Sequence, residues 1–148
     1  MRKTTYKENK MKDKKFAPIT ELRFKIVGVA IKTLDRLGTA HPEEVYDSIF
    51  RVDLEKAGLD VTNKPKLLLK DANGKVVKTY LPDLRVRHEG LSVLVELKAD
   101  PQGLQASHKR QAKAYLSSSQ KDQAVFLINF GCKKKNTPEV DSIFRRDL

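Results

Sequence analysis

The sequence predicts one α/β domain in which two helices, three strands, a crossover helix and a last strand build a four-stranded mixed sheet flanked by helices. Two observations predict this order. Apolar residues recur at helical spacing within residues 19–58 and 102–119, and β-branched and aromatic runs occupy residues 61–99 and 123–131. At 148 residues the chain is long enough to enclose one hydrophobic core.

Two helices are expected at the start of the domain, over residues 19–38 and 42–58. Thr20 is a suitable N-cap for the first helix, and Gly38 is a suitable stop. Pro42 suits the first position of the second helix, and acidic residues follow in its first turn, where the helix dipole favours them.

Three β-rich runs follow, at residues 61–71, 75–86 and 91–99. Asn73-Gly74 separates the first two runs and favours a two-residue type I′ turn, because that turn needs a positive φ at both positions. The crossover helix and the last strand then complete the predicted sheet.

The ends of the chain differ in character from the domain, which we place at residues 18–132. Residues 1–17 carry seven Lys or Arg against two acids and have few apolar residues, so we expect a flexible basic arm. Residues 133–148 are polar, and we expect a C-terminal tail with a short amphipathic segment near Ile143 and Phe144.

The charge balance indicates a polyanionic partner. The formal net charge is +11, from 30 Lys and Arg against 19 Asp and Glu. Such a balance favours nucleic acid over an anionic membrane surface. The alternative is that the lysines only keep the protein soluble, and charge alone does not name an activity.

The sequence also bears on the compartment. It shows neither the apolar core of a secretory signal nor a stretch approaching the ~18 apolar residues of a membrane span. Cys132 is a single cysteine, which excludes an intrachain disulfide and argues against a thiolate metal site. We expect an intracellular protein without a membrane partner, in the cytoplasm, nucleus or nucleoid.

The register of the second and third strands gathers charged residues at one place. If Glu89-Gly90 is a two-residue turn, Asp83 faces Glu96, and Lys98 lies beside Glu96 on the same side of the sheet. The opposite side then carries the apolar residues Leu84, Val86, Val93, Val95 and Leu97. Leu94 shares the charged side, which indicates that this side is covered rather than open.

Two opposed carboxylates repel each other unless a cation lies between them. Their hard oxygen atoms suit Mg²⁺, with Mn²⁺ as a substitute, and the adjacent Lys98 could orient a water molecule or hold a phosphate. This set describes metal-assisted hydrolysis of a phosphodiester. The alternative is a solvated hairpin face on which Lys98 is only a counter-ion.

A known family has the same pattern. Residues 82–83 and 96–98 read P-D and E-L-K with twelve residues between them, which resembles the PD-(D/E)XK nuclease superfamily. The segments LGTAHPEEVYDSIF, YLPDLRV, VLVELKA, HKRQAKAYL and FLINFG are similar in order and spacing to its GxxExxY family, over roughly residues 20–131. The resemblance implies a restriction-endonuclease-like core and a Mg²⁺-dependent endonuclease.

The resemblance also implies a role for each matching residue of the strands. Asp83 and Glu96 match the metal-binding acids, and the backbone carbonyl of Leu97 is implied as a further ligand. Lys98 matches the catalytic lysine.

Further roles fall on the two flanking helices. Glu43 and Tyr46 match the E-x-x-Y signature, in which the acid completes the metal site, although Ala40 stands where the family has a glycine. Gln111 matches the glutamine near the phosphate or water, and His108, one turn earlier, is positioned to contact substrate. The alternatives are a packing role for Tyr46 and a plain surface position for His108.

Five basic residues are expected to contact phosphates with little sequence preference: Arg85, Arg87, Lys109, Arg110 and Lys113. The leading hypothesis is a metal-dependent nuclease, with DNA favoured over RNA as substrate. The alternatives are a non-catalytic nucleic-acid-binding protein and a structural subunit of a nucleoprotein assembly. A homodimer or a protein partner stays open.

Overall fold

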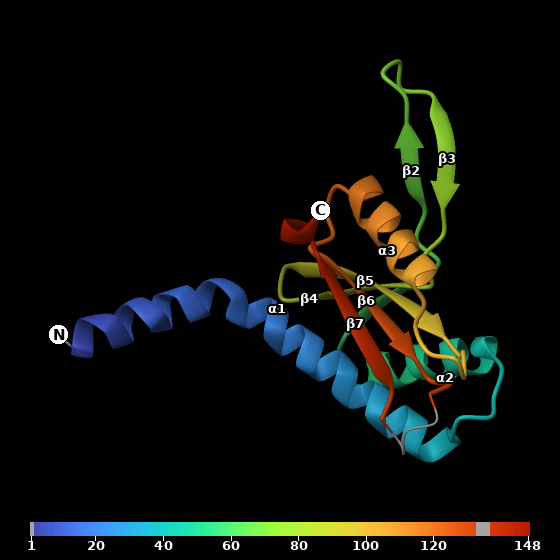
Figure 1. The fold of residues 1–148 in the computed structure, drawn as a ribbon, viewed down its shortest axis with the longest axis horizontal. Helices are drawn as coiled ribbons and strands as arrows, with labels where there is room; N and C mark the ends of the chain where they lie inside the picture. Colours follow the sequence, from blue (N-terminus) through green and yellow to red (C-terminus); the bar gives the residue numbers. More distant parts are fainter. Residues whose placement is uncertain (1, 133–136) are drawn as a thin grey trace.

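The computed structural model describes residues 2–132 and 137–148, with residues 2–17 described as backbone alone. The helices are α1 (Arg2–Leu37), α2 (Glu43–Lys56), α3 (Ala106–Ser118) and the short 3-10 helix η1 (Arg145–Asp147) (Figure 1). The strands are β1 (Asp60–Asn63), β2 (Leu67–Lys70), β3 (Val76–Tyr80), β4 (Leu84–His88), β5 (Leu91–Lys98), β6 (Ala124–Asn129) and β7 (Glu139–Phe144).

The main sheet is mixed and has the strand order β1-β4-β5-β6-β7. The pair β5–β6 is parallel, joined through α3, and the other three pairs are antiparallel. The predicted α/β fold class is therefore confirmed, and it is consistent with a restriction-endonuclease-like core. The sheet has five strands rather than the four expected, and β2 and β3 form a separate two-stranded sheet.

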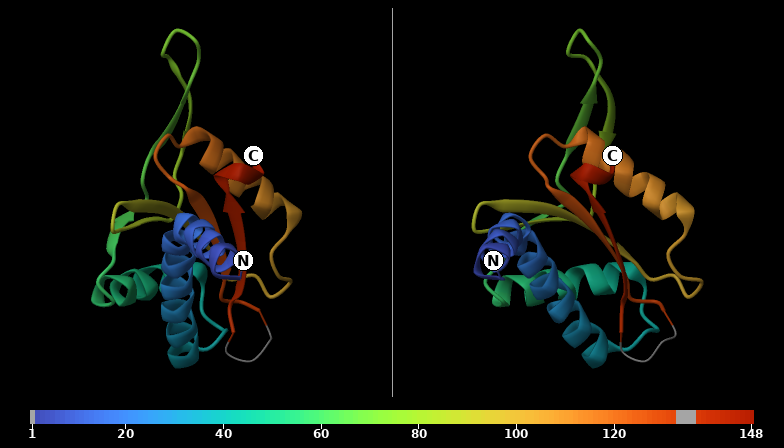
Figure 2. Two further views of the ribbon diagram at one scale, coloured as in Figure 1. Left: turned by 90° about the vertical axis from the view of Figure 1, so that its left-hand side faces the viewer. Right: turned by 60° about the vertical axis from the view of Figure 1, so that its left-hand side comes forward.

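Helices cover both faces of the main sheet (Figure 2). On one face, α1 and α2 pack over a core that includes Ile26, Phe50, Val95 and Phe126. On the other face, α3 and the base of β2 pack over a smaller core that includes Leu94. The covered second face is the one on which the charged residues lie.

Two prolines explain why the sheet differs from the expectation. Pro65 divides the run at residues 61–71 into β1 and β2, and Pro82 divides the run at 75–86 into β3 and β4. Proline lacks the N–H that a sheet needs, so each run ends there and restarts in another direction. The hairpin β2–β3 consequently projects beyond the main sheet in both views (Figures 1 and 2).

The turn of this hairpin also differs from the expected type I′ form. Gly74 has a φ of 81°, whereas Asn73 does not have a positive φ. The N–H groups of Asn73 and Lys75 donate to Oδ1 of Asp71, and the register shifts between Leu69 and Lys70. The side chain of Asp71 therefore stabilises a longer turn with a bulge, in which one positive φ is enough.

Helix α1 begins at Arg2 rather than near Thr20, so residues 2–17 extend it away from the sheet (Figure 1). Pro18 lies inside the helix, where its ring removes one backbone hydrogen bond. A flexible arm over residues 1–17 stays a prediction. Within the described ranges, no helix is long and apolar enough to cross a membrane.

The expected C-terminal tail is part of the sheet where the structure describes it. Ile143 and Phe144 belong to β7, which pairs along its length with β6. The guanidinium of Arg145 then donates to the carbonyls of Leu116, Ser119 and Asp122, which fixes the end of α3. Of the predicted tail, residues 133–136 lie outside the described residues.

Candidate functional site

The hairpin β4–β5 has the register that the sequence predicts. His88 pairs with Leu91, Val86 with Val93 and Leu84 with Val95. Both turn residues have a positive φ, 50° at Glu89 and 80° at Gly90, as a type I′ turn requires. This register brings Asp83, one residue before β4, opposite Glu96 of β5.

Asp83 and Glu96 are linked through the backbone. The N–H of Asp83 donates to Oε1 of Glu96 at 3.0 Å, and the N–H of Leu97 donates to Oδ2 of Asp83 at 2.7 Å. Glu96 is only 4% exposed, so the charged side of the hairpin is covered, as predicted. Burial, together with the hydrogen bond and charge of Asp83, raises the pKa of Glu96 to about 8.

Lys98 lies at the end of β5, next to the first half of α3. Its Nζ donates to Oε1 of Gln111 at 3.5 Å, so the predicted lysine and glutamine meet. Lys98 also lines a pocket of about 400 Å³ with Glu43 and His108. Nδ1 of His108 accepts the N–H of Gln105, which caps α3 and fixes the imidazole at the rim of this pocket.

Glu43 comes from the first turn of α2, and Tyr46 fixes the loop before it. The Tyr46 hydroxyl donates to the carbonyl of Gly38 and accepts the N–H of His41. Its ring is fully buried and stacks on Phe130 at 4.8 Å. Tyr46 is thus a packing residue that positions the start of α2, which is the alternative interpretation of the E-x-x-Y signature.

Electrostatics link Glu43 to the residues of the hairpin. Burial raises the pKa of Glu43, the charge of Asp83 raises it further, and the ammonium group of Lys98 opposes both. The three predicted acids, Glu43, Asp83 and Glu96, and Lys98 therefore form one electrostatic cluster, built from α2, the residue before β4, and β5.

Asp47 also belongs to this cluster, although the sequence motif does not include it. Burial and the charge of Asp83 raise its pKa, so it faces the same acids. Among the described residues, its Oδ1 is the buried side-chain oxygen without a hydrogen-bond partner. The available signal was its position one helical turn after Glu43, which places both carboxylates on one face of α2.

Two further residues hold parts of the site in place, through contacts with Glu96 and with Asp100. Tyr115 of α3 forms a hydrogen bond with Glu96, and burial with the neighbouring Glu96 charge raises the pKa of its phenol. Asn129, fully buried at the end of β6, contacts both the N–H and the carbonyl of Asp100 through its amide. It therefore ties down the segment that follows Lys98. No sequence signal distinguished either residue from ordinary core positions.

The five predicted phosphate-contacting residues separate into different environments. Arg85 does not fit the prediction, because its guanidinium is buried and donates to both oxygens of Asp122, at 3.0 and 2.8 Å. Its position on the α3-covered face of β4 explains this. Arg87 lies at the far end of β4 beside Asp60, and Lys109 pairs with Asp141 at 3.2 Å. Two remain exposed and without an ion pair in the described chain, Arg110 and Lys113.

The donor chemistry of the cluster fits a hard divalent cation. Carboxylate oxygens are the ligands that Mg²⁺ prefers, and a cation would offset both the burial and the Asp83 charge that raise the pKa of Glu96. In the described part of the chain, no three His, Cys, Asp or Glu side chains are arranged to hold an ion as they stand. One carboxylate oxygen of Asp83, Oδ2, accepts the N–H of Leu97 in this arrangement.

Comparison with known protein families matches residues 20–142 to the PD-(D/E)XK nuclease superfamily. No curated protein matches the chain. The matched range contains the whole site, from Glu43 to Gln111, and also most of β7. The finer assignment to the GxxExxY family stays a prediction. On the match, the fold and the acid–acid–lysine register, the chain belongs to the PD-(D/E)XK nuclease superfamily.

Proposed function

We propose that this protein is a Mg²⁺-dependent endonuclease that hydrolyses phosphodiester bonds in DNA. Membership of the superfamily indicates a nuclease-type function, and such nucleases typically use divalent metals. The observation that carries the proposal is the placement of Asp83 opposite Glu96, with Lys98 beside them and Gln111 against Lys98.

Asp83 and Glu96 are the residues that would hold the ion, with Glu43 as the third acid and the Leu97 carbonyl as a further ligand. The ion would supply Lewis acidity, which neutralises charge on the phosphate and lowers the pKa of a water molecule. Tyr115 and the Asp83 backbone N–H hold the Glu96 carboxylate in place from either side. The carboxylate of Glu96 is thus held on β5 before substrate arrives.

Lys98 and Gln111 act on the substrate side of the acids. The ammonium group of Lys98 can donate to the attacking water or to a phosphate oxygen, and Gln111 holds that group in position. His108 presents its free ring edge to the same pocket, because its Nδ1 is engaged in the helix cap. Substrate therefore enters between the start of α2 and the start of α3.

The burial of Glu96 beside Asp83 favours catalysis over simple binding. A protein that only binds phosphates gains nothing from carboxylates that repel them, and a buried ionised acid costs several kcal/mol unless it is paired. Glu96 nevertheless occupies a covered position next to Asp83, with little exposure. Without an ion the pKa of Glu96 is raised to about 8, and a cation bound beside Asp83 would restore its charged form. The basic balance of the chain and its exposed lysines support a nucleic acid substrate.

A plasmid-cleavage assay tests the proposal. The wild type is expected to nick or linearise supercoiled DNA with Mg²⁺ or Mn²⁺, and Lys98→Ala should reduce the rate by about 100-fold or more, as loss of a group acting in the transition state does. Lys56→Ala, on the far face of the domain, is the matched control. Equal trace cleavage by all three proteins would identify a contaminant and refute the enzyme.

A thermal shift with Mn²⁺ tests the ion separately. A cation that binds only the folded state raises the melting temperature of the wild type and should fail to raise that of Asp83→Ala. Glu44→Ala, next to Glu43 but outside the site, should respond as the wild type does. An equal shift in Asp83→Ala would place the ion elsewhere.

A further inference from the structure

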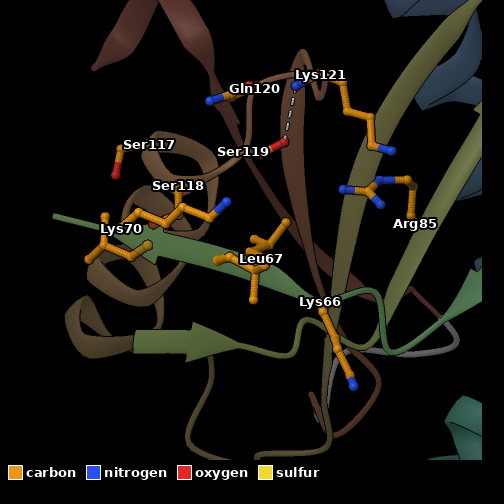
Figure 3. Close-up of a pocket in the computed structure, with 11 residues that line it drawn as sticks. Lys66, Leu67, Lys70, Arg85, Ser117, Ser118, Ser119, Gln120 and Lys121 are labelled. Carbon is orange, nitrogen blue, oxygen red and sulfur yellow. Dashed lines mark hydrogen bonds between the residues drawn. The ribbon is translucent and has the colours of Figure 1, made fainter. Parts of the chain in front are cut away.

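A second basic hollow lies away from the acidic cluster, between the projecting hairpin and the end of α3 (Figure 3). Its volume is about 610 Å³. One wall is β2 with its preceding residue, from Lys66 to Lys70, and the other is the end of α3 with the following loop, from Ser117 to Lys121. We call this hollow the hairpin pocket.

Among the described residues, the lining of the hairpin pocket combines four cations, three serines and Gln120 with the apolar residues Leu67, Leu68 and Leu69, and it includes no acid. Lys66, Lys70 and Lys121 are exposed, and none of them forms an ion pair within the described part of the chain. Figure 3 shows Lys70 beside Ser117 and Ser118 on one side of the hollow, Lys121 near Arg85 on the other, and Lys66 at its lower edge. Lysine ammonium groups next to serine hydroxyls are typical contacts of a phosphate backbone.

The nearby acid Asp122 does not neutralise the lysines of the pocket, because its carboxylate has other partners. Asp122 is the nearest acid in sequence to Lys121, but its carboxylate is buried against Arg85, Ser92 and Ser119. Arg85 lines the pocket with its guanidinium already paired to Asp122, so the pair contributes little net charge. The lysines of the rim therefore keep an uncompensated positive field.

The hairpin carries the same charge beyond the pocket. Residues 64–80 contain five lysines and one acid, Asp71, whose carboxylate is held by two backbone N–H groups of the turn. The base of the hairpin is fixed to the acidic cluster, because the N–H of Lys64 donates to the carbonyl of Asp83 at 2.8 Å. Basic residues thus run from the proposed active site to the pocket along one connected element.

Helix α3 sets the spacing between the two places. Its face that carries His108 and Gln111 at the proposed active site carries Ser118 at the pocket. The ten residue steps from His108 to Ser118 span about 15 Å along the helix axis, at a rise of ~1.5 Å each. Since phosphates of one strand of a duplex follow at ~3.4 Å along its axis, this is about four nucleotides.

We propose that the hairpin pocket binds the phosphate backbone of the nucleic acid substrate about four nucleotides from the bond that is cut. This inference rests on the proposed function for the position of that bond, but binding at the pocket does not require cleavage. The hairpin is then the part of the protein that holds the substrate, while the acidic cluster acts on it. Apolar side chains also project from the hairpin, such as Val77, which makes a protein partner the competing occupant.

Salt-dependent binding in EDTA tests the pocket without cleavage. The triple variant Lys66→Glu, Lys70→Glu, Lys121→Glu is compared with a triple variant of equal charge change on α1 and α2, Lys25→Glu, Lys32→Glu, Lys56→Glu. Fluorescence anisotropy measures affinity for labelled DNA and RNA duplexes of one sequence. All six lysines are exposed, so both variants should fold as the wild type does.

The pocket variant should lose about tenfold or more in affinity, and its log–log salt slope should fall by about 2–3, close to 0.9 for each phosphate that is no longer neutralised. The control should lose much less. The two duplexes show which backbone the protein prefers, and loss with either one supports the pocket. Equal losses in the two variants would overturn it, as would unchanged binding together with a change in oligomeric state by sedimentation.

The outcomes separate this inference from the proposed function. If the wild type cleaves DNA with Mg²⁺ and the pocket variant binds as the control does, the pocket is refuted and the nuclease stands. If the pocket variant loses affinity but the wild type never cleaves, the nuclease is refuted and the pocket stands.

Discussion

The carboxylate of Asp47 adds a further acid to the three that the sequence motif implies. Its Oδ1 is buried without a hydrogen bond, and its neighbours include Asp83 as well as the cations Arg51 and Lys64. Without a bound cation, repulsion from Asp83 and the unsatisfied oxygen both disfavour the folded state. We infer that Asp47 is held in place for the site rather than for stability.

Asp47→Ala is therefore expected to stabilise the metal-free protein, by on the order of 1 kcal/mol, since it removes an unpaired buried oxygen and one like charge. Urea unfolding in EDTA measures this. Glu44→Ala, on the exposed side of the same turn, is the control for helix propensity. A loss of stability in Asp47→Ala would show instead that the attraction of the Arg51 and Lys64 charges dominates.

The buried pair of Arg85 and Asp122 gives a prediction on pH. Burial raises the pKa of Asp122, but hydrogen bonds from Arg85, Ser119 and Ser92 outweigh it, so the pKa lies below its ordinary value of 3.8. A carboxyl with a lowered pKa contributes stability above its unfolded pKa and loses it as pH falls through the folded one. The free energy of unfolding should therefore fall steeply below pH 3.8.

Asp122→Ala checks the origin of that fall. It should cost about 3–5 kcal/mol at neutral pH, because it leaves the buried guanidinium of Arg85 unpaired. Its difference from the wild type should shrink as acid protonates Asp122 in the native protein. A difference that stays constant down to the lowest pH would mean that the carboxylate charge plays no part.

For single residues, the alternation of apolar and polar positions predicted which side of the sheet each side chain occupies. Asp83, Glu96 and Lys98 were predicted on one side because a one-residue slip would have moved Leu84 and Val95 to the face with the charged residues. Arg85 was misplaced because its partner Asp122 lies far along the chain, and no local pattern shows that the two meet. Charge alone did not distinguish a buried arginine from a phosphate contact.

Among the elements, the end of β5 and the end of β6 together set the position of Lys98. The N–H of Phe130 donates to the carbonyl of Lys98 at 2.8 Å, and Gly131 packs against the backbone of the following turn. A Cβ at Gly131 would lie 2.5 Å from the carbonyl carbon of Ala99 and 2.6 Å from the nitrogen of Asp100. The two strand ends can approach this closely only without a side chain there.

Gly131→Ala is expected to push the two strand ends apart, to cost about 1–3 kcal/mol of stability as overpacking does, and to reduce cleavage by displacing Lys98. Calorimetry and the plasmid assay measure the two effects. Gly28→Ala in α1, where a Cβ meets nothing within 4 Å, is the control and should be neutral or slightly stabilising. Full activity in Gly131→Ala would show that Lys98 does not depend on this contact.

Helices and central strands were predicted more closely than the edges. The continuous apolar run of β6 and the stripe of α2 are strong local signals, and both elements are found within a few residues of the expected bounds. The strands break at Pro65 and Pro82 because proline lacks the N–H of a strand, and this effect outweighs the β propensity of the neighbouring residues. Strand β7 was interpreted as a tail because an edge strand with only one well-buried residue, Ile143, has little apolar pattern.

In the whole molecule, the proposed catalytic residues of β5 and the proposed substrate-binding pocket lie on the same face of the sheet. Asp83, Glu96 and Lys98 lie near the start of α3, and the hairpin pocket lies at its end. Helices α1 and α2 pack on the opposite face, and the first turns of α2 bring Glu43 and Asp47 to the cluster. The sequence indicated the first place through a short motif, and its chemistry stays a proposal. It did not predict the pocket, because Lys66 and Lys121 come from elements that only the fold brings together.

The central claim is that Asp83, Glu96 and Lys98 form a metal-dependent hydrolytic site. The most direct test measures cleavage of a labelled DNA duplex with and without metal. It compares the wild type with Glu96→Gln. The exchange keeps the shape of the side chain and removes the charge that would hold the ion. We expect cleavage by the wild type that stops in EDTA and returns with Mg²⁺, and a rate at least about 100-fold lower in Glu96→Gln. Cleavage by the wild type that persists in EDTA, or equal rates in the two proteins, would contradict it.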